Sequence, residues 1–170
     1  WLLAGMRFGK RQIFNTVDKS KYTLSIHNLE IGFATAWNPS GKLLATSEGV
    51  NIRIANDRGE DIVIFTGHVS DVTDLSWVTE RFLLSSSRDG SVRMWDIEEK
   101  SELQCWFLSD VPLHSVAVHP SGERFAIGSN RDVKIFQQSP LDAESRVQIP
   151  NEVGDLSVKF DNKNRVTQLH

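Results

Sequence analysis

Residues 67–96 read Gly67-His-Val-Ser-Asp-Val-Thr-Asp-Leu-Ser-Trp-Val-Thr-Glu-Arg-Phe-Leu-Leu-Ser-Ser-Ser-Arg-Asp-Gly-Ser-Val-Arg-Met-Trp-Asp96. Within this stretch, Ser91-Val-Arg-Met-Trp95 alternates polar and apolar residues, as a half-buried strand does. Arg88-Asp-Gly90 has the residues of a tight hairpin connection and stands between two apolar runs. The stretch therefore predicts a strand near Val72–Val78, a second strand after Arg81, a turn at Asp-Gly and a third strand ending at Trp95.

Two positions of this stretch recur along the chain at a nearly fixed interval. The position of Trp95 lines up, at steps of 41, 40 and 41 residues, with Phe14, Ala55 and Phe136. The position of Trp77 lines up, at steps of 40, 41 and 42 residues, with Trp37, Val118 and Phe160. No window keeps a helical period over three turns, so the chain is predicted to be all-β and built from repeats.

The order Gly-His, strand, strand, Asp-Gly turn, strand, Trp-Asp resembles a WD40 repeat, and the interval agrees with the roughly 40–45 residues of one such repeat. In that family each repeat forms one blade of a β-propeller. Only Gly67–Asp96 keeps the full pattern, and the other repeats of this chain are divergent. The resemblance implies a platform that binds proteins rather than an enzyme, and it does not identify a partner.

The repeats also predict where each blade ends. We expect the outermost strands at Tyr22–Ile26, Ile62–Thr66, Leu103–Phe107 and Arg146–Ile149. The chain would then hold three complete four-stranded blades and two partial ones, about four blade equivalents, divided as 1–26, 27–66, 67–107, 108–150 and 151–170. Because closed propellers have about four to eight blades, we expect a segment of a larger propeller with seven or more blades. The alternative is a ring completed by another chain or by a second copy.

In WD40 proteins, blade residues form a hydrogen-bonded tetrad, and the resemblance places it here on His68, Asp89, Trp95 and either Ser85 or Ser87. The imidazole would join the carboxylate to a serine hydroxyl, which would accept from the indole N–H. A buried polar group without a partner costs about 1–3 kcal/mol, so each member needs the others. The same residue types could form a catalytic Ser-His-Asp triad, but a nucleophile must face an open site. We therefore expect a structural role.

Propellers bind partners mainly through loops, because the blades stay rigid while the loops vary. In the family that this chain resembles, the usual docking face carries the loops between second and third strands and between blades. The residues that we expect there are Arg7, Glu30, Glu48, Asp71, Arg88, Pro112 and Ser129. The alternative is that these side chains form only a solvated rim.

The composition removes several other classes of function. The net charge is −3, and the chain has no basic cluster longer than Gly9-Lys-Arg11, so we do not expect direct binding of nucleic acid. No apolar run approaches the roughly 18 residues of a membrane span. The five histidines are scattered and lack ligand spacing, so no metal or cofactor is expected. The single cysteine, Cys105, agrees with a reducing, intracellular setting, either cytoplasmic or nuclear.

Three functions remain, and they are ranked by these patterns. The first is a non-catalytic scaffold that presents loops on a rigid propeller so that other proteins assemble on it. The second is a ligand-sensing or regulatory module of a larger signalling or defence protein. A propeller enzyme comes third, because Asp74 is the one obvious acid in the innermost strands. Trp37 and Trp77 recur at the repeat interval, so we expect them to pack between blades rather than to anchor a partner.

Overall fold

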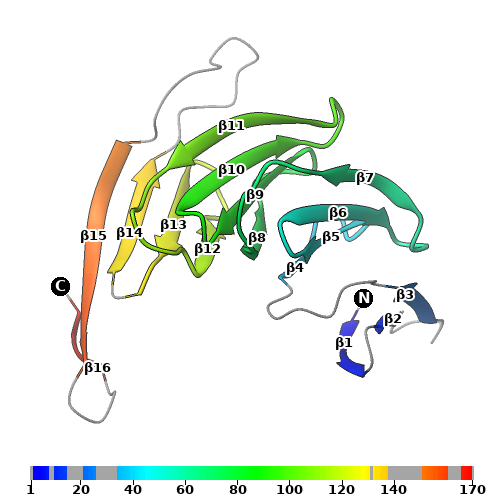
Figure 1. Cartoon of the computed structure of the whole chain (residues 1–170), viewed down its shortest axis with the longest axis horizontal. Helices are drawn as coiled ribbons and strands as arrows, with labels where there is room; N and C mark the ends of the chain where they lie inside the picture. The colour runs from blue at the N-terminus through cyan, green and yellow to red at the C-terminus, as the bar shows by residue number, and fades with distance from the viewer. Residues whose placement is uncertain are drawn as a thin grey trace.

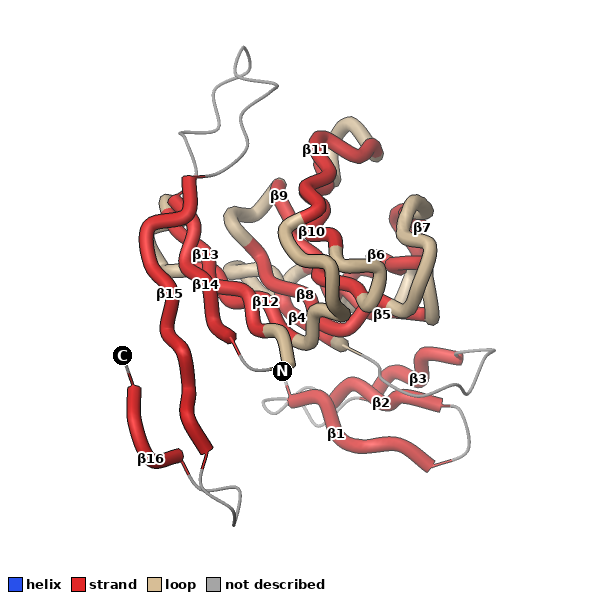
Figure 2. The backbone as a smooth tube through the Cα atoms, turned by 60° about the vertical axis from the view of Figure 1, so that its left-hand side comes forward, coloured by secondary structure: helices blue, strands red, loops and turns tan. Residues whose placement is uncertain are grey.

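The structure is a computed structural model that describes the backbone of residues 2–7, 10–14, 21–25, 34–130, 132–137, 151–160 and 166–169. Side chains are described for residues 34–130, 132–137, 152 and 153. All regular elements in these ranges are β-strands, and none of the described residues is helical (Figure 2). The prediction of an all-β chain is confirmed.

The strands form four antiparallel sheets, and each strand pairs with the next one along the chain. The first sheet has three strands, namely β1 (Leu2–Arg7), β2 (Lys10–Phe14) and β3 (Lys21–Ser25). The second has β4 (Thr35–Trp37), β5 (Leu43–Glu48), β6 (Asn51–Asn56) and β7 (Asp61–Phe65). The third has β8 (Val72–Trp77), β9 (Phe82–Ser87), β10 (Ser91–Asp96) and β11 (Ser101–Phe107). The fourth has β12 (Ser115–Val118), β13 (Arg124–Gly128), β14 (Asp132–Gln137), β15 (Asn151–Phe160) and β16 (Val166–Leu169).

The second, third and fourth sheets stand next to one another (Figure 1). The first strand of the third sheet, β8, contacts the first strands of both neighbours, β4 and β12. Each sheet then runs outward by simple hairpins to its last strand. Consecutive four-stranded meanders whose first strands meet at a common centre are the blades of a propeller. The structure is therefore a propeller segment, as the repeats predict.

A β-bulge recurs at the same place in the second, third and fourth sheets. The register shifts between Ile54 and Ala55, between Met94 and Trp95, and between Ile135 and Phe136. These shifts fall at the positions that the sequence aligns with one another. A bulge places one extra residue in one strand and increases the local twist. The common bulge supports the alignment even at Ala55, where the tryptophan is missing.

The fourth sheet corrects one prediction about the outermost strands. The strands expected at Tyr22–Ile26, Ile62–Thr66 and Leu103–Phe107 agree with β3, β7 and β11 within two residues. The partner of β14, however, is β15 at Asn151–Phe160, not Arg146–Ile149, which lies outside the described residues. The prediction left residues 138–145 between the two strands, whereas in the structure residues 138–150 separate them. This connection is longer than residues 57–60 and 97–100, which join the corresponding strands of the two preceding sheets.

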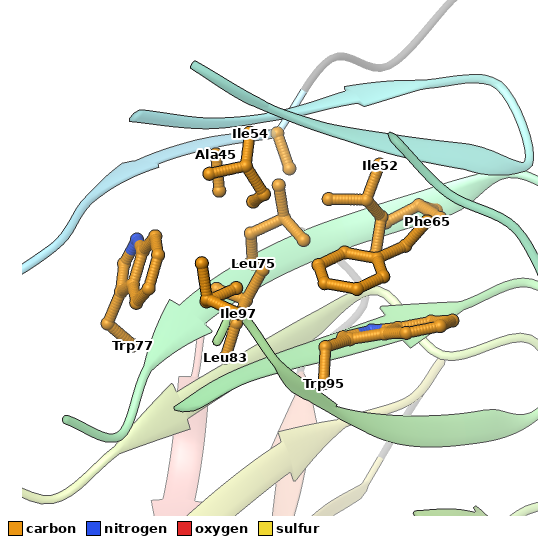
Figure 3. Packing of buried hydrophobic residues seen from close by; sticks show 11 residues of the cluster. Ala45, Ile52, Ile54, Phe65, Leu75, Trp77, Leu83, Trp95 and Ile97 are labelled. Atoms are coloured by element: carbon orange, nitrogen blue, oxygen red, sulfur yellow. The ribbon is translucent and has the colours of Figure 1, made fainter. Parts of the chain in front are cut away.

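Two apolar clusters hold the three neighbouring sheets together. Between the second and third sheets, Ile52, Ile54 and Phe65 pack against Leu75 and Trp95, as Figure 3 shows. The rings of Phe65 and Trp95 are stacked, with centroids 4.9 Å apart. Each fully buried side chain of this size contributes about 1.5–3 kcal/mol to the free energy of unfolding. The cluster therefore explains why neighbouring blades stay in fixed positions.

The second cluster lies between the third and fourth sheets and includes Leu84, Val92, Trp106, Phe125 and Phe136. The rings of Phe125 and Phe136 are stacked at 5.4 Å. Residues at the Trp77 position contribute to these interfaces: Trp77 is a member of the first cluster, and Val118 packs against the second. The prediction that Trp77 packs between blades is confirmed.

Candidate functional site

The structure brings four of the predicted tetrad residues together in one hydrogen-bonded chain. The Nδ1 of His68 lies 2.9 Å from Oδ2 of Asp89, and its Nε2 lies 2.7 Å from Oγ of Ser85. The indole N–H of Trp95 donates to the same Ser85 oxygen over 2.9 Å. One tautomer satisfies all three contacts: Nδ1–H donates to the carboxylate, and Nε2 accepts from the hydroxyl.

Two serines complete the surroundings of Asp89. Ser87 does not contact the imidazole; its hydroxyl donates to the backbone oxygen of Ser70 over 3.0 Å and accepts from the Asp89 N–H over 3.1 Å. Ser91, which the sequence analysis missed, donates from its hydroxyl to Oδ1 of Asp89 over 2.6 Å. A serine two residues after aspartate in a tight turn was the signal that could have identified it.

The electrostatics keep this network in one protonation state. Burial raises the pKa of Asp89, but hydrogen bonds from Ser91, His68 and backbone N–H groups outweigh it and bring the pKa to about 2. Burial also lowers the pKa of His68, although Asp89 opposes that shift. At neutral pH the carboxylate is therefore charged and the imidazole is neutral, which agrees with the single tautomer above.

The network has no access for a substrate. The exposed fraction of the His68 side chain is 0%, that of Asp89 is 3%, and Ser85 is fully buried. A Ser-His-Asp triad needs its nucleophile at an open site. The arrangement can hold the ends of three strands together, but its hydroxyl cannot reach a bound carbonyl group.

Gly67 lies in a crowded place beside this network. A Cβ at this position would lie 2.8 Å from Nη1 of Arg93 and 2.9 Å from Oε2 of Glu102, which form an ion pair. It would also lie 3.1 Å from the indole of Trp95. A larger residue here would have to displace the Arg93 and Glu102 side chains and would crowd the Trp95 ring, so glycine suits this position.

Asp96, the aspartate of the Trp-Asp pair, makes a separate set of contacts at the other end of the blade. Both carboxylate oxygens of Asp96 accept from the guanidinium of Arg81, at 2.8 and 2.6 Å. Oδ1 also accepts from the backbone N–H groups of Glu98 and Glu99. Burial raises the pKa of Asp96, but Arg81 and these N–H groups outweigh it and lower the pKa. Asp96 thus fixes the turn between β10 and β11.

Asp74, the one acid noted in the innermost strands, is engaged with the backbone. Its Oδ2 accepts from the N–H of Val116 over 3.0 Å, and its Oδ1 accepts from the N–H of Leu75 over 2.9 Å. Among the residues whose side chains are described, no three His, Cys, Asp or Glu residues form a group able to hold a metal ion. Through its hydrogen bond from Val116, Asp74 joins the third sheet to the fourth.

The seven residues predicted for a docking face are found in different situations. Arg88 and Pro112 are exposed, whereas Ser129 and Asp71 are half-buried. Glu48 is held by the guanidinium of Arg53, 2.7 Å away. Arg7 is the last residue of β1 with an undescribed side chain, and Glu30 lies outside the described residues.

The loops at this end of the blades also expose apolar side chains that the sequence analysis missed. We use the term loop face for the described residues that join β5 to β6, β7 to β8, β9 to β10, β11 to β12 and β13 to β14. On it, Val69 is 80% exposed, and Val50 and Val111 are exposed as well. An apolar residue beside Gly, Ser, Asp or Pro in a predicted loop is the signal that could have found them. This face combines apolar side chains with the charge of Arg88.

A groove opens at the edge of the loop face, between the third and fourth sheets. It encloses about 390 Å³ and is lined by Phe107, Leu108, Ser109, Asp110, Val111, Leu113, Ile127, Ser129, Asp132 and Lys134. It includes Ser129, one of the residues predicted for the docking face.

No helix in the described part of the chain is long and apolar enough to cross a membrane.

Comparisons with known proteins agree with this geometry. The family model described as WD domain, G-beta repeat matches residues 59–96. SIR4-interacting protein SIF2 of Saccharomyces cerevisiae (strain ATCC 204508 / S288c) is 27% identical over 124 residues, which are 71% of this chain and 23% of that relative. This chain therefore spans about a quarter of the length of that relative.

Two solved structures have a similar fold. The crystal structure of the C-terminal WD40 domain of Sif2 matches with a TM-score of 0.67 and 22% identity, over 82% of this chain and 45% of that one. A chain in the crystal structure of a mitotic checkpoint complex matches with a TM-score of 0.68 and 20% identity, over 91% and 50%. At these identities the likeness concerns the fold alone.

Proposed function

The chain is a segment of a WD40-repeat β-propeller, and on that premise we propose that it is a non-catalytic scaffold whose loop face binds other proteins and helps assemble a complex. One observation carries the proposal: backbone hydrogen bonds join the loops that carry the exposed side chains, both within a blade and between neighbouring blades. The N–H of Val72 donates to the oxygen of Gly49, and that of Arg88 donates to the oxygen of Asp71, at 2.8 and 3.0 Å. The N–H of Leu113 similarly donates to Ser87 over 3.2 Å.

These backbone hydrogen bonds order the loops before a partner binds, which is the property that a binding scaffold needs. A loop that is ordered before the partner arrives loses little conformational entropy on binding, so more of the contact energy appears as affinity. The exposed Val69 and Val111 offer apolar contact, and Arg88 offers a charge that fixes orientation. The buried hydrogen-bonded network around His68 supports the same conclusion, since it offers no accessible catalytic group.

One relative supports the proposal through its name alone, since it is called a SIR4-interacting protein. We propose for this chain an equivalent role with partners that are proteins, in an intracellular setting, without a cofactor and without direct contact to nucleic acid or membrane. A propeller of seven or more blades, with blade divisions near residues 26, 66 and 107, belongs to the same proposal.

The test is affinity capture with the full chain, followed by quantitative identification of the bound proteins. Val69→Asp combined with Arg88→Glu changes two exposed loop-face residues that support none of the side-chain contacts described above. The matched control is Lys42→Glu with Glu123→Lys, two exposed residues at the opposite ends of the strands. We expect specific partners to be lost from the first variant and kept by the second. An unchanged set of partners on the first variant would contradict the loop face as the docking surface.

A further inference from the structure

We propose that the groove between the third and fourth sheets binds an extended protein segment in which an apolar side chain stands next to a lysine or arginine. This inference rests on the proposed scaffold function, because it assigns a partner chemistry to one place at the edge of the loop face. It is carried by the exposure of Phe107, by the apolar floor of the groove and by two acidic side chains that line it.

The apolar half of the groove is built from both sheets. Phe107, at the end of β11, is 72% exposed, the highest value for an aromatic side chain among the described residues. Below it, Leu113 and Ile127 are almost fully buried and form the floor. The floor is closed, so the accessible apolar area is that of the exposed Phe107 ring, against which the anchoring side chain of a partner can pack.

The charged half of the groove is acidic. Asp110 comes from the loop between β11 and β12, and Asp132 begins β14; both are exposed, and neither forms an ion pair with a described residue. Among the described residues of the lining, the one cation is Lys134, which is already paired with Glu152, its Nζ lying 3.3 Å from Oε2. Within the described part of the chain, the two carboxylates therefore have no cation paired with them, and they favour a partner that brings a positive charge.

The wall of the groove is held in place before a partner arrives. The loop that carries Ser109 and Asp110 crosses directly over Gly90, so closely that a Cβ on Gly90 would lie 2.2 Å from the Ser109 oxygen. The N–H of Leu108 donates to the oxygen of Gly90 over 3.2 Å. Because of these contacts, the loop that carries Ser109 and Asp110 is fixed to the turn between β9 and β10. Such preorganisation favours a short segment, which has little contact area with which to offset ordering.

The size of the groove matches a few side chains rather than a folded domain. Ligand sites commonly enclose about 300–1,000 Å³, and this one encloses about 390 Å³. An extended segment places alternate side chains on one side, so one apolar side chain can pack on the Phe107 ring while a neighbouring cation meets the acids. A folded partner would instead need the wider loop face.

The experiment selects peptides from a library of random short sequences displayed on phage, using the full chain as bait. The variants are Phe107→Ser, which removes the exposed ring, and Asp110→Lys with Asp132→Lys, which reverses the charge of the lining. Glu123→Lys, an exposed acid on the opposite side of the fourth sheet, is the matched control. Thermal unfolding of each variant verifies that the fold is kept. If the double reversal does not fold, Asp110→Asn with Asp132→Asn replaces it.

We expect selected peptides to share an apolar residue beside lysine or arginine, and their affinity to fall about tenfold or more in Phe107→Ser. The charge-reversed variant should select glutamate or aspartate in place of the cation, and Glu123→Lys should select as the parent does. The inference is overturned if no common sequence emerges, if the sequence lacks a cation, or if neither groove variant changes binding. It is also overturned if light scattering shows a dimer that Phe107→Ser dissociates, since a second copy would then occupy the groove. Partners that depend on Val69 and Arg88 but not on the groove would leave the scaffold function intact.

Discussion

The backbone N–H of Val116 donates to the carboxylate of Asp74 over 3.0 Å, and the two residues are 42 positions apart in the chain. Two residues further along both strands, the N–H of Val118 donates to the hydroxyl of Ser76 over 3.1 Å, again 42 positions apart. These bonds join the first strands of the third and fourth sheets near the centre of the propeller. At the neighbouring interface the indole N–H of Trp77 instead donates to the backbone oxygen of Ala36 over 3.0 Å.

Replacing Asp74 by alanine should weaken the contact between the third and fourth sheets. The N–H of Val116 would lose its acceptor, and a buried donor without a partner costs about 1–3 kcal/mol of the free energy of unfolding. Asp74→Asn keeps an acceptor oxygen and is the matched control, with an expected loss well below that of alanine. Urea unfolding followed by fluorescence measures both. Equal losses in the two variants would show that the hydrogen bond does not matter.

Replacing His68 by alanine should lower the free energy of unfolding by about 1–3 kcal/mol. The substitution leaves Ser85 and Asp89 without their shared partner and opens space beside Trp95, whose ring meets the imidazole edge. His119→Ala, an exposed histidine in a turn, should change stability by no more than about 0.5 kcal/mol. Thermal melts of both variants measure the two changes in stability. If His68→Ala melts as the parent does, the network has no structural role.

The stability of the protein should fall as the pH drops below 6.5. Burial lowers the pKa of His68 from its ordinary 6.5, so the unfolded chain binds a proton more readily than the folded one in the range just below that value. Asp89 adds a second, more acidic range. Its pKa is about 2 against an ordinary 3.8, so its contribution is present above 3.8 and is lost as the pH falls toward 2.

Urea unfolding of the parent and of His68→Ala across a pH series separates these two contributions. The decline just below pH 6.5 should be smaller in the variant, because the buried imidazole is gone. A parent whose stability is constant between pH 6.5 and 5 would contradict the lowered pKa of His68.

Replacing Gly90 by alanine should destabilise the protein more than the same change at Gly122. Both residues have a positive φ, +81° and +74°, so each alanine carries the left-handed penalty of about 1–2 kcal/mol. At Gly122 the nearest described atom is an ordinary 3.6 Å from the new Cβ, whereas at Gly90 the Ser109 oxygen is 2.2 Å away. The extra loss at Gly90 should show in thermal melts and should accompany weaker binding of peptides to the groove. Equal losses at the two sites would contradict the close crossing.

The repeat interval allowed the sequence to predict much of the fold, because packing between blades repeats with it. Trp77 and Trp95 occupy buried positions for the same reason that they recur in the alignment. The choice between Ser85 and Ser87 could not be made, since residues two apart in a strand point to the same face and only the distance to the imidazole separates them. Ser91 was missed because its contact with Asp89 depends on the path of the turn.

The outermost strand of the fourth sheet shows a different limit. An average interval carries no information on which connection is longer than the others, and residues 138–150 separate β14 from a partner that begins at Asn151. The contacts of surface side chains were harder to predict than the strands. Glu48 was predicted at a docking face from its place in the repeat, but its ion pair with Arg53 depends on side-chain positions across two strands.

The bulge that recurs at Ala55, Trp95 and Phe136 also decides how the outside of the propeller meets other chains. A bulged, strongly twisted edge is a poor template for a further strand, so the perimeter formed by β7 and β11 resists the edge-to-edge pairing through which open sheets aggregate. With its edge strands protected in this way, a propeller can expose several sheet edges without polymerising. This agrees with the proposal that partner proteins bind at the ends of the strands rather than at the perimeter.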